Sequence, residues 1–431
     1  MRASKVAEFR PHPLRDVVLH EIHSRPFQSL TTPARILHFG FTHDFAQSTA
    51  DRRAFAQFCI DHGALAPENS SRHHIAHFNG LTLRWEQHSE FTTYTYIVEG
   101  DCAASLVSAL ALATPVIASL PQTGPLLVSV VLSLEADAGA PTFAEIFDES
   151  SLVVSRMSRD GAITATDFQL RDDGFVHILV LNKSLSPNRA GALTQRLLEI
   201  ETYRTLALLG LPEALRCAPR VRIVEEGLNE ILQDMGRDGS TTDAGDADHK
   251  MLDQITRLAA EIETDIAASS YRFGASRAYN DLVLQRLTAL GEASFQDFST
   301  FDSFLARRLA PAMRTCQTMT ARQADLSQKL SRATNLLRTR VDVAIERQNR
   351  DLLHSMNERT RLQLRLQQTV EGLSVAAISY YVVSLLGYVF KGVKEFGYGP
   401  DPAYSVALAA PVVVLGVALI VRRVRGAHAD H

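Results

Sequence analysis

The sequence lacks the short motifs that assign a chain to the large enzyme classes. It contains no P-loop, no GxGxxG following a strand, no GxSxG and no arrangement of a cysteine nucleophile with a histidine. It also has no internal repeat and no nucleic-acid-binding module. These absences leave the chain without an assigned catalytic activity, and we expect no nucleic-acid partner.

Cysteine is scarce and never paired in the sequence. Cys59, Cys102, Cys217 and Cys316 are isolated, with no CxxC pair among them. This usage is typical of reduced thiols in a cytosolic compartment, and it argues against a disulfide framework or a thiolate zinc site. Residues 1–13 contain no apolar run, so we expect no cleavable signal peptide.

Glycine and proline are absent from the sixty residues 312–371, so nothing in the backbone interrupts a helix there. A straight helix of that length would reach about 90 Å. Its apolar or small positions follow a 3–4 rhythm: Leu326, Leu330, Ala333, Leu337, Val341, Ala344, Leu352, Met356, Leu362, Leu366, Val370 and Leu373. The pattern predicts a rigid stalk helix over 312–372, with one narrow face that packs against partners.

Charge is absent from two later segments, 373–390 and 403–421, of eighteen and nineteen residues. Because about 20 apolar residues cross a bilayer, we predict two transmembrane helices, an external loop 391–402 and a cytosolic tail 422–431. Arginine flanks the pair on its two outer sides, at Arg359, Arg361, Arg365, Arg422, Arg423 and Arg425. In the loop, Lys391 and Lys394 are offset by Glu395 and Asp401. The positive-inside rule then places both termini in the cytoplasm.

Charge is unevenly distributed along the chain. Residues 1–311 carry 28 Lys and Arg against 39 Asp and Glu, whereas residues 312–372 carry 11 against 6. Two interpretations are open. The charges form solvated helix faces, or the basic stalk meets anionic lipid or the acidic head of another chain.

Strand and helix patterns alternate after a segment rich in proline and histidine at 1–30. They predict an α+β or α/β head over 31–183. The expected strands are 35–41, 73–78, 81–87, 91–98, 126–134, 152–155, 162–170 and 175–181; the expected helices are 49–61 and 103–113. From 184 to 311 only helices are expected, at 190–209, 219–233, 251–269, 275–290 and 300–309, with a mobile loop at 234–249.

The strands 81–87 and 91–98 alternate in period two, as a half-buried hairpin does. Arg84, Glu86 and His88 share one face of it. This face is either a site that binds an acid and shuttles protons, or a solvated or ion-paired sheet surface. Charges also lie beside aromatic residues on helices at 199–204 and 271–279, where helix–helix ion pairs are the simpler interpretation.

Ten of the fifteen histidines fall within the first ninety residues. His20 and His23 lie near one face if that segment is helical, and they are the candidate ligands for a divalent cation. His73, His74 and His77 also lie near one face if their segment is helical. In a strand, however, His74 points away from the other two. Scattered polar histidines at turns and strand ends are the alternative in both places.

In the first predicted span, Tyr380, Ser384, Gly387 and Lys391 form a stripe of polar and small residues. Such a stripe permits close helix packing. In an oligomer the same face could line an aqueous path.

Four groups of residues carry a resemblance along nearly the whole chain: 12–27; 83–86 with 90–95; 199–204 with 272–279; and 372–374 with 380–381. They resemble an uncharacterised bacterial membrane-protein family of unknown function, sometimes labelled egg lysin. The resemblance implies a bacterial inner-membrane location and does not indicate an activity.

The order of predicted segments also looks like the CorA-type magnesium channels, in which a cytosolic head is followed by a long helix, span one, a short external loop and span two. Those channels are pentamers in which span one lines the pore and an aromatic-Gly-Met-Asn motif closes it. Here Tyr398, Gly399 and Asp401 lie at the comparable place, with Pro400 between them; methionine and asparagine are missing. The resemblance implies a pore lined by the span-one stripe and closed near these residues.

The expected fold is thus an α+β cytosolic head, a helical middle with a very long helix, and a C-terminal two-helix transmembrane hairpin. We expect the lipid bilayer as a partner, and homo-oligomers formed through the stalk and the first span. Three functions remain open: a CorA-like cation channel or its non-conducting relative, a membrane-anchored enzyme or metal-binding module using the histidine-rich head, and a membrane-tethered scaffold.

Overall fold

A computed structural model gives the arrangement of the chain. The residues that it describes are 12–15, 18–19, 27–68, 71–78, 80–103, 105–122, 124–137, 143–237, 244–395, 397 and 401–428. The chain divides into two compact units. Unit 1 is Met1–Asp234 with Ile255–Arg332, and unit 2 is Met235–Gln254 with Ala333–His431.

The elements follow one another as strands first and helices afterwards. The strands are β1 (Ala34–Thr42), β2 (His73–Phe78), β3 (Leu81–Gln87), β4 (Phe91–Glu99), β5 (Leu126–Ala136), β6 (Val153–Met157), β7 (Ala162–Leu170), β8 (Val176–Asn182) and β9 (Ala293–Ser294). The helices are α2 (Phe45–Asp61), the 3₁₀ turn η1 (Gly100–Ala103), α3 (Leu106–Ala118), α4 (Phe143–Ile146), α5 (Pro187–Leu208), α6 (Gly210–Arg237), α7 (Ala244–Ala289), α8 (Phe301–Glu395) and α9 (Pro402–His428).

The described strands of unit 1 form one nine-stranded sheet, in the order β2-β3-β4-β1-β5-β8-β7-β6-β9. Neighbouring strands are antiparallel except for β5 and β8, which are parallel. The mixed sheet with its helices confirms the predicted α+β class of the head. Each of the eight predicted strands is present, with ends that differ by at most two residues.

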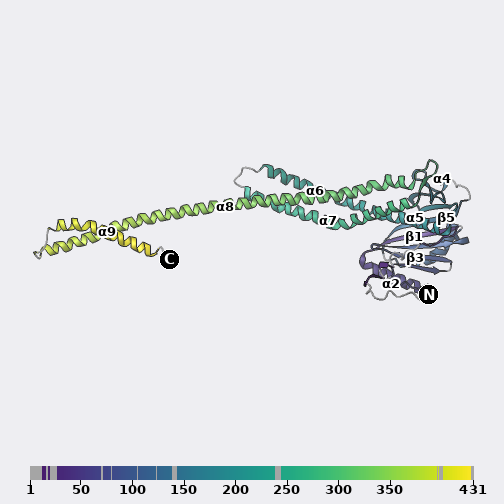
Figure 1. The fold of residues 1–431 in the computed structure, drawn as a ribbon, viewed down its shortest axis with the longest axis horizontal. Helices are drawn as coiled ribbons and strands as arrows, with labels where there is room; N and C mark the ends of the chain where they lie inside the picture. Colours follow the sequence, from purple (N-terminus) through teal and green to yellow (C-terminus); the bar gives the residue numbers. More distant parts are fainter. Residues whose placement is uncertain are drawn as a thin grey trace. The chain divides into compact units, whose positions relative to one another are not determined.

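The half of the sheet that contains β1, β3 and β4 is covered on both faces (Figure 1). One face bears Phe39, Trp85 and Tyr94, which pack with Phe55 of α2 and Ala109 of α3 in a buried core. The other face lies under α5. The hairpin of β3 and β4 is therefore buried on both faces, and the expected half-buried hairpin was wrong. The period-two alternation separates an apolar face from a polar one, but the polar face meets a helix instead of water.

The predicted helices are present, and several are longer than expected. Helix α7 joins the expected helices 251–269 and 275–290 through Gly274, and α8 begins at Phe301 and continues through Pro311. Proline removes one helical hydrogen bond, but Leu309, Ala312 and Met313 are buried beside it, and this packing outweighs the local preference. The expected loop 234–249 is shorter, since α6 ends at Arg237 and α7 begins at Ala244.

Helix α8 is 95 residues long, which confirms a very long helix and extends it beyond the expected 312–372. In unit 2 its apolar stripe is buried at Leu337 and Val341, and Met235 and Met251 of the same unit are also buried. Arg340 Nη1 donates a hydrogen bond to the Met235 carbonyl at 3.0 Å. The stripe is exposed farther along, from Leu352 onward. The members exposed by more than half are Leu352, Met356, Leu362, Leu366, Val370 and Leu373.

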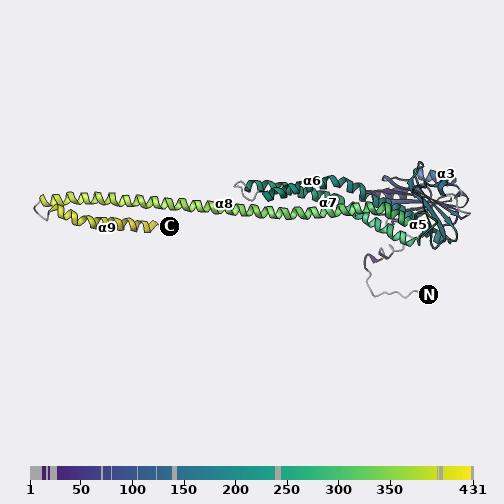
Figure 2. The same ribbon diagram turned by 90° about the horizontal axis from the view of Figure 1, so that it is seen from above.

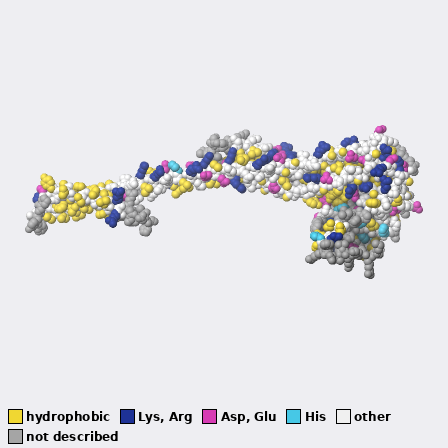
Figure 3. Space-filling model, in the orientation of Figure 1, with side chains coloured by type: hydrophobic (Ala, Val, Ile, Leu, Met, Phe, Trp, Pro, Cys, Tyr) yellow, Lys and Arg dark blue, Asp and Glu magenta, His cyan; other side chains and the backbone are white. Residues whose placement is uncertain are grey.

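Helix α9 folds back along the end of α8 within unit 2 (Figures 1 and 2). A Cβ atom added at Gly387 would lie 3.5 Å from Val406 Cγ2, so the two helices approach closely there. Each carries a segment long and apolar enough to cross a membrane. Apolar side chains cover the visible surface of this helix pair, with Lys and Arg at its borders (Figure 3).

Three cysteines, Cys59, Cys217 and Cys316, are buried free thiols. The structure does not describe the side chain of Cys102. Burial raises the pKa of Cys59 to about 11, so this thiol stays protonated at neutral pH. Cys59, Cys217 and Cys316 act as small apolar core residues.

Candidate functional site

A polar cavity of about 170 Å³ lies between the sheet and helices α5 and α7 in unit 1. This volume is well above the roughly 15 Å³ that one water molecule needs. The sheet contributes residues from β1, β3 and β4, the turn between β3 and β4 contributes His88, and the helices contribute the rest. The lining residues are His38, Arg84, Glu86, His88, Phe91, Thr93, Gln195, Leu198, Glu199, Thr202, Tyr203 and Arg286. We call this space the sheet–α5 cavity.

His38 is held between two hydroxyl groups at the base of the cavity. Its Nε2 lies 3.0 Å from Thr202 Oγ1, and its Nδ1 lies 2.8 Å from Thr95 Oγ1. Thr202 donates its only hydroxyl proton to the Leu198 carbonyl at 2.8 Å, so Nε2 of His38 must be the donor to Thr202. Nδ1 is then the acceptor from Thr95. The contacts thus select one neutral tautomer.

Burial, followed by the nearby positive charge of Arg84, lowers the pKa of His38 to about 3. His38 is only 3% exposed. The imidazole is therefore neutral throughout the physiological pH range. It orders the base of the cavity and does not carry a proton in or out.

A chain of charged and amide groups follows one side of the cavity. Arg84 pairs with Glu86 at 3.1 Å and donates to Gln195 Oε1 at 3.3 Å. Gln195 Nε2 donates to Glu199 Oε1 at 2.9 Å, and Glu199 accepts in turn from Arg286 Nε. Arg84 and Glu86 are buried, so the solvated interpretation of their face was wrong and the ion-paired one is confirmed.

Aromatic rings form the wall next to these charges. His88 stacks on Phe91 with ring centroids 4.1 Å apart, and Tyr203 stacks on Tyr279 of α7 at 5.8 Å. Close by, Glu90 accepts from Arg272 of α7 at 3.2 and 2.5 Å. These contacts hold α7 against the hairpin. Arg272 thus pairs with the turn that joins β3 and β4, and the prediction of a helix–helix ion pair was wrong for this residue.

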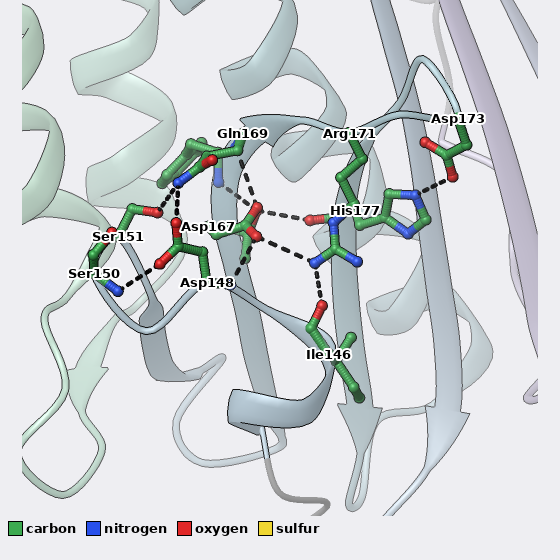
Figure 4. Close-up of polar contacts among 11 residues, drawn as sticks. Ile146, Asp148, Ser150, Ser151, Asp167, Gln169, Arg171, Asp173 and His177 are labelled. Atoms are coloured by element: carbon green, nitrogen blue, oxygen red, sulfur yellow. Dashed lines mark hydrogen bonds and ion pairs between the residues drawn. The ribbon is translucent and has the colours of Figure 1, made fainter.

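A second polar cluster, at the end of β7, contrasts with the cavity (Figure 4). Asp167 is 3% exposed, accepts from the backbone N–H groups of Asp148 and Gln169 at 3.2 and 3.1 Å, and pairs with Arg171 at 3.1 Å. Gln169 Nε2 donates to Asp148 and Ser151 at 2.8 and 2.7 Å. The buried carboxylate is fully partnered. This cluster fixes residues 146–151 on the sheet, and we assign it to the fold.

Of the candidate metal ligands, those that the structure describes do not line the sheet–α5 cavity. His20 and His23 fall outside the described residues. His73, His74 and His77 lie on β2, and His74 Nε2 is 2.7 Å from the Leu65 carbonyl. Among the described residues no group of three or more His, Cys, Asp or Glu side chains could hold a metal ion.

The candidate pore residues are partly separated. Tyr380 is 72% exposed and Lys391 is exposed, whereas Ser384 is half-buried and Gly387 faces α9. Asp401 precedes α9, and one of its carboxylate oxygens lies 3.6 Å from Lys394 Nζ. Tyr398 and Gly399 fall outside the described residues.

The sequence singled out Arg84, Glu86, His88 and Glu199, and the structure places all four on one cavity. It did not single out His38, Gln195, Thr202 or Arg286. His38 carried a signal, because it is the one polar residue inside the apolar run Ile36–Phe41. Arg286 carried none, since nothing local distinguishes it from other charged residues on a long helix.

The fold and the cavity define a protein with a mixed-sheet domain, a polar, ion-paired cavity and two C-terminal helices of membrane-spanning length and composition. The chain belongs to the family described as "Protein of unknown function (DUF3422)", which matches residues 10–428. A comparison with curated proteins finds no match.

Proposed function

We propose that this is a multi-pass protein of the bacterial inner membrane, anchored by a hairpin of the end of α8 and α9. The spans would be 373–390 and 403–421, the external loop 391–402, and both termini would be cytoplasmic. One observation carries the proposal: the two apolar segments contain almost no buried residue, and they expose large apolar side chains. Tyr388 and Leu408, for example, are 77% and 81% exposed. Apolar patches of this extent require a cover of lipid or protein.

Two alternative explanations of apolar helices fit poorly here. A core helix of a soluble domain would be buried, whereas almost none of either segment is. A signal sequence would lie near the N-terminus, whereas both segments are C-terminal. The flanking arginines, including Arg365 before the first segment and Arg422 after the second, have the asymmetry of a cytoplasmic boundary.

We further propose that the protein self-associates through α8. The apolar stripe that is buried at Leu337 and Val341 continues as exposed residues from Leu352 to Leu373. A membrane hairpin would force two copies to insert in the same direction, so their α8 helices would be parallel and in register. A second copy would then cover the stripe, as in a parallel coiled coil.

The test is self-association in membranes washed with alkaline carbonate. The wild-type chain should stay in the washed membranes, and an amine-reactive cross-linker should trap oligomers there. Leu366→Glu places a charge on the stripe and should abolish most of the cross-linked product. Leu364→Glu is the matched control, because Leu364 is exposed but off the stripe.

Release of the wild-type chain by carbonate would contradict the membrane proposal. Equal cross-linking of the Leu366→Glu and Leu364→Glu variants would contradict self-association through the stripe while leaving the anchor intact.

A cation channel of the CorA type is a second candidate, favoured by the order of a sheet domain, one long helix, a short connection and a second apolar helix. Tyr380 and Lys391 are not covered by α9, so they are available to a path between copies.

If span one lines such a path, Ser384→Cys in a chain without its native cysteines should react with a water-soluble thiol reagent. Lys391→Gln should raise cation flux into liposomes, because a positive charge at the mouth repels cations, and Asp401→Asn should lower it. An inert Ser384→Cys with no flux change in either charge variant would leave the two spans as an anchor only, for a scaffold or for an enzyme or metal-binding head.

A further inference from the structure

We infer that the sheet–α5 cavity is a binding site for a small zwitterion, a molecule that carries both a carboxylate and a protonated amine, as an amino acid does. Both a positively charged and a negatively charged side chain in this cavity have hydrogen-bonding atoms that no described contact engages. The inference concerns unit 1 alone and is independent of the membrane proposal.

The positive side of the site is Arg286. Among its described contacts only Nε is engaged, with Glu199, and the side chain is 32% exposed, so the two terminal nitrogens remain to be bound. Arg84 adds a second guanidinium, whose buried Nε has no hydrogen-bond partner among the described residues. Guanidinium groups bind carboxylates through two parallel hydrogen bonds, which is the strongest form of this contact.

The negative side of the site is Glu86. Its Oε2 pairs with Arg84, and no described contact engages its Oε1, although the side chain is only 10% exposed. A carboxylate oxygen of a largely buried side chain that lines a cavity is a strong acceptor for an ammonium group. Glu86 also lies on a strand, which holds it in place more firmly than a loop would.

The balance of charge decides between ligand classes. The lining holds two arginines and two glutamates, and His38 is neutral. A ligand of single charge would give this balanced site, which contains the buried Arg84–Glu86 pair, a net charge, which is costly away from water. A zwitterion brings a carboxylate to the guanidinium groups and an amine to Glu86, so both existing pairs are kept. Leu198, Phe91 and Tyr203 would face the uncharged part of the ligand.

The experiment is isothermal titration calorimetry on the full chain in detergent, with L-alanine, L-leucine and L-glutamine as probes. Each is compared with two analogues, one without the amine and one without the carboxylate. At least one amino acid should bind about tenfold or more tightly than both of its analogues, since each analogue loses a charged hydrogen bond.

Two variants test direct contact. Arg286→Gln should weaken binding of that amino acid about tenfold or more. Glu86→Gln should remove its preference over the analogue without the amine, which a merely structural change would not do. Arg322→Gln is the control, because its ion pair with Glu225 at 2.6 Å lies outside the cavity.

Three results would overturn the inference: no binding heat with any of the three amino acids, equal affinity for an amino acid and its single-charge analogues, or an unchanged preference in the Glu86→Gln variant. Urea unfolding of each variant, followed by the emission of Trp85, shows whether a loss of binding reflects a loss of folded protein.

Discussion

Replacing Phe55 by alanine is expected to lower the free energy of unfolding of the sheet domain by about 3–5 kcal/mol. Phe55 is fully buried and stacks on Trp85 with ring centroids 4.9 Å apart. It also meets Tyr94 edge to face at 5.8 Å. Removal of the ring loses apolar burial and leaves a cavity whose other walls are large aromatic rings on a sheet, which cannot move in to fill it.

The measurement is urea unfolding of the full chain in detergent, read as the midpoint of the Trp85 emission change. Trp85 is the only tryptophan in the sequence, so the signal reports this domain alone. Ile60→Ala on the same helix is the control: Ile60 is 59% exposed and should change stability by about 0.5 kcal/mol or less. Equal effects of the two variants would show that α2 does not pack on the sheet as described.

The second large effect is a dependence of stability on pH that originates at His38. Folding lowers the pKa of this group from 6.5 to about 3. Between these values the unfolded chain binds a proton that the folded chain does not, so stability falls as the pH falls. From about pH 7.5 to about pH 5.0 the loss attributable to His38 is about 2 kcal/mol, and it continues to grow toward pH 3.

The comparison is between the wild type and His38→Gln, by the same urea assay at the two pH values. The variant is expected to be less stable at pH 7.5, because it perturbs two buried hydrogen bonds, but to lose about 2 kcal/mol less on acidification. His77→Gln removes an exposed histidine and should retain the wild-type pH dependence. If His38→Gln loses as much stability as the wild type, the imidazole is not held neutral.

The sequence predicts the elements of the sheet domain well because its strands are bounded by turns and alternate cleanly. Leu81–Gln87 and Phe91–Glu99 show the limit of that signal. Alternation identifies two different faces, but it does not tell whether the polar one meets water or a polar helix. Here α5 brings Gln195 and Glu199 to that face, from a sequence separation of more than a hundred residues.

Helix breaks were overestimated for a related reason. Pro311 and Gly274 signal interruption locally, but each lies inside a helix whose neighbouring turns are buried. The charged face of β3 is the part of the cavity that the sequence could identify, because Arg84 and Glu86 are two residues apart and therefore share one face of a strand. It could not identify Arg286 as the partner of Glu199, because that ion pair depends on how two long helices pack.

The central claim is that α8 and α9 cross the membrane as a hairpin. Reporter fusions test it most directly: a reporter active only in the periplasm is inserted after Pro400, or fused at residue 1 or residue 431. The account predicts activity for the insertion after Pro400 and none for the two terminal fusions. Activity at either terminus, or none after Pro400 in a chain that is expressed and stable, would contradict it.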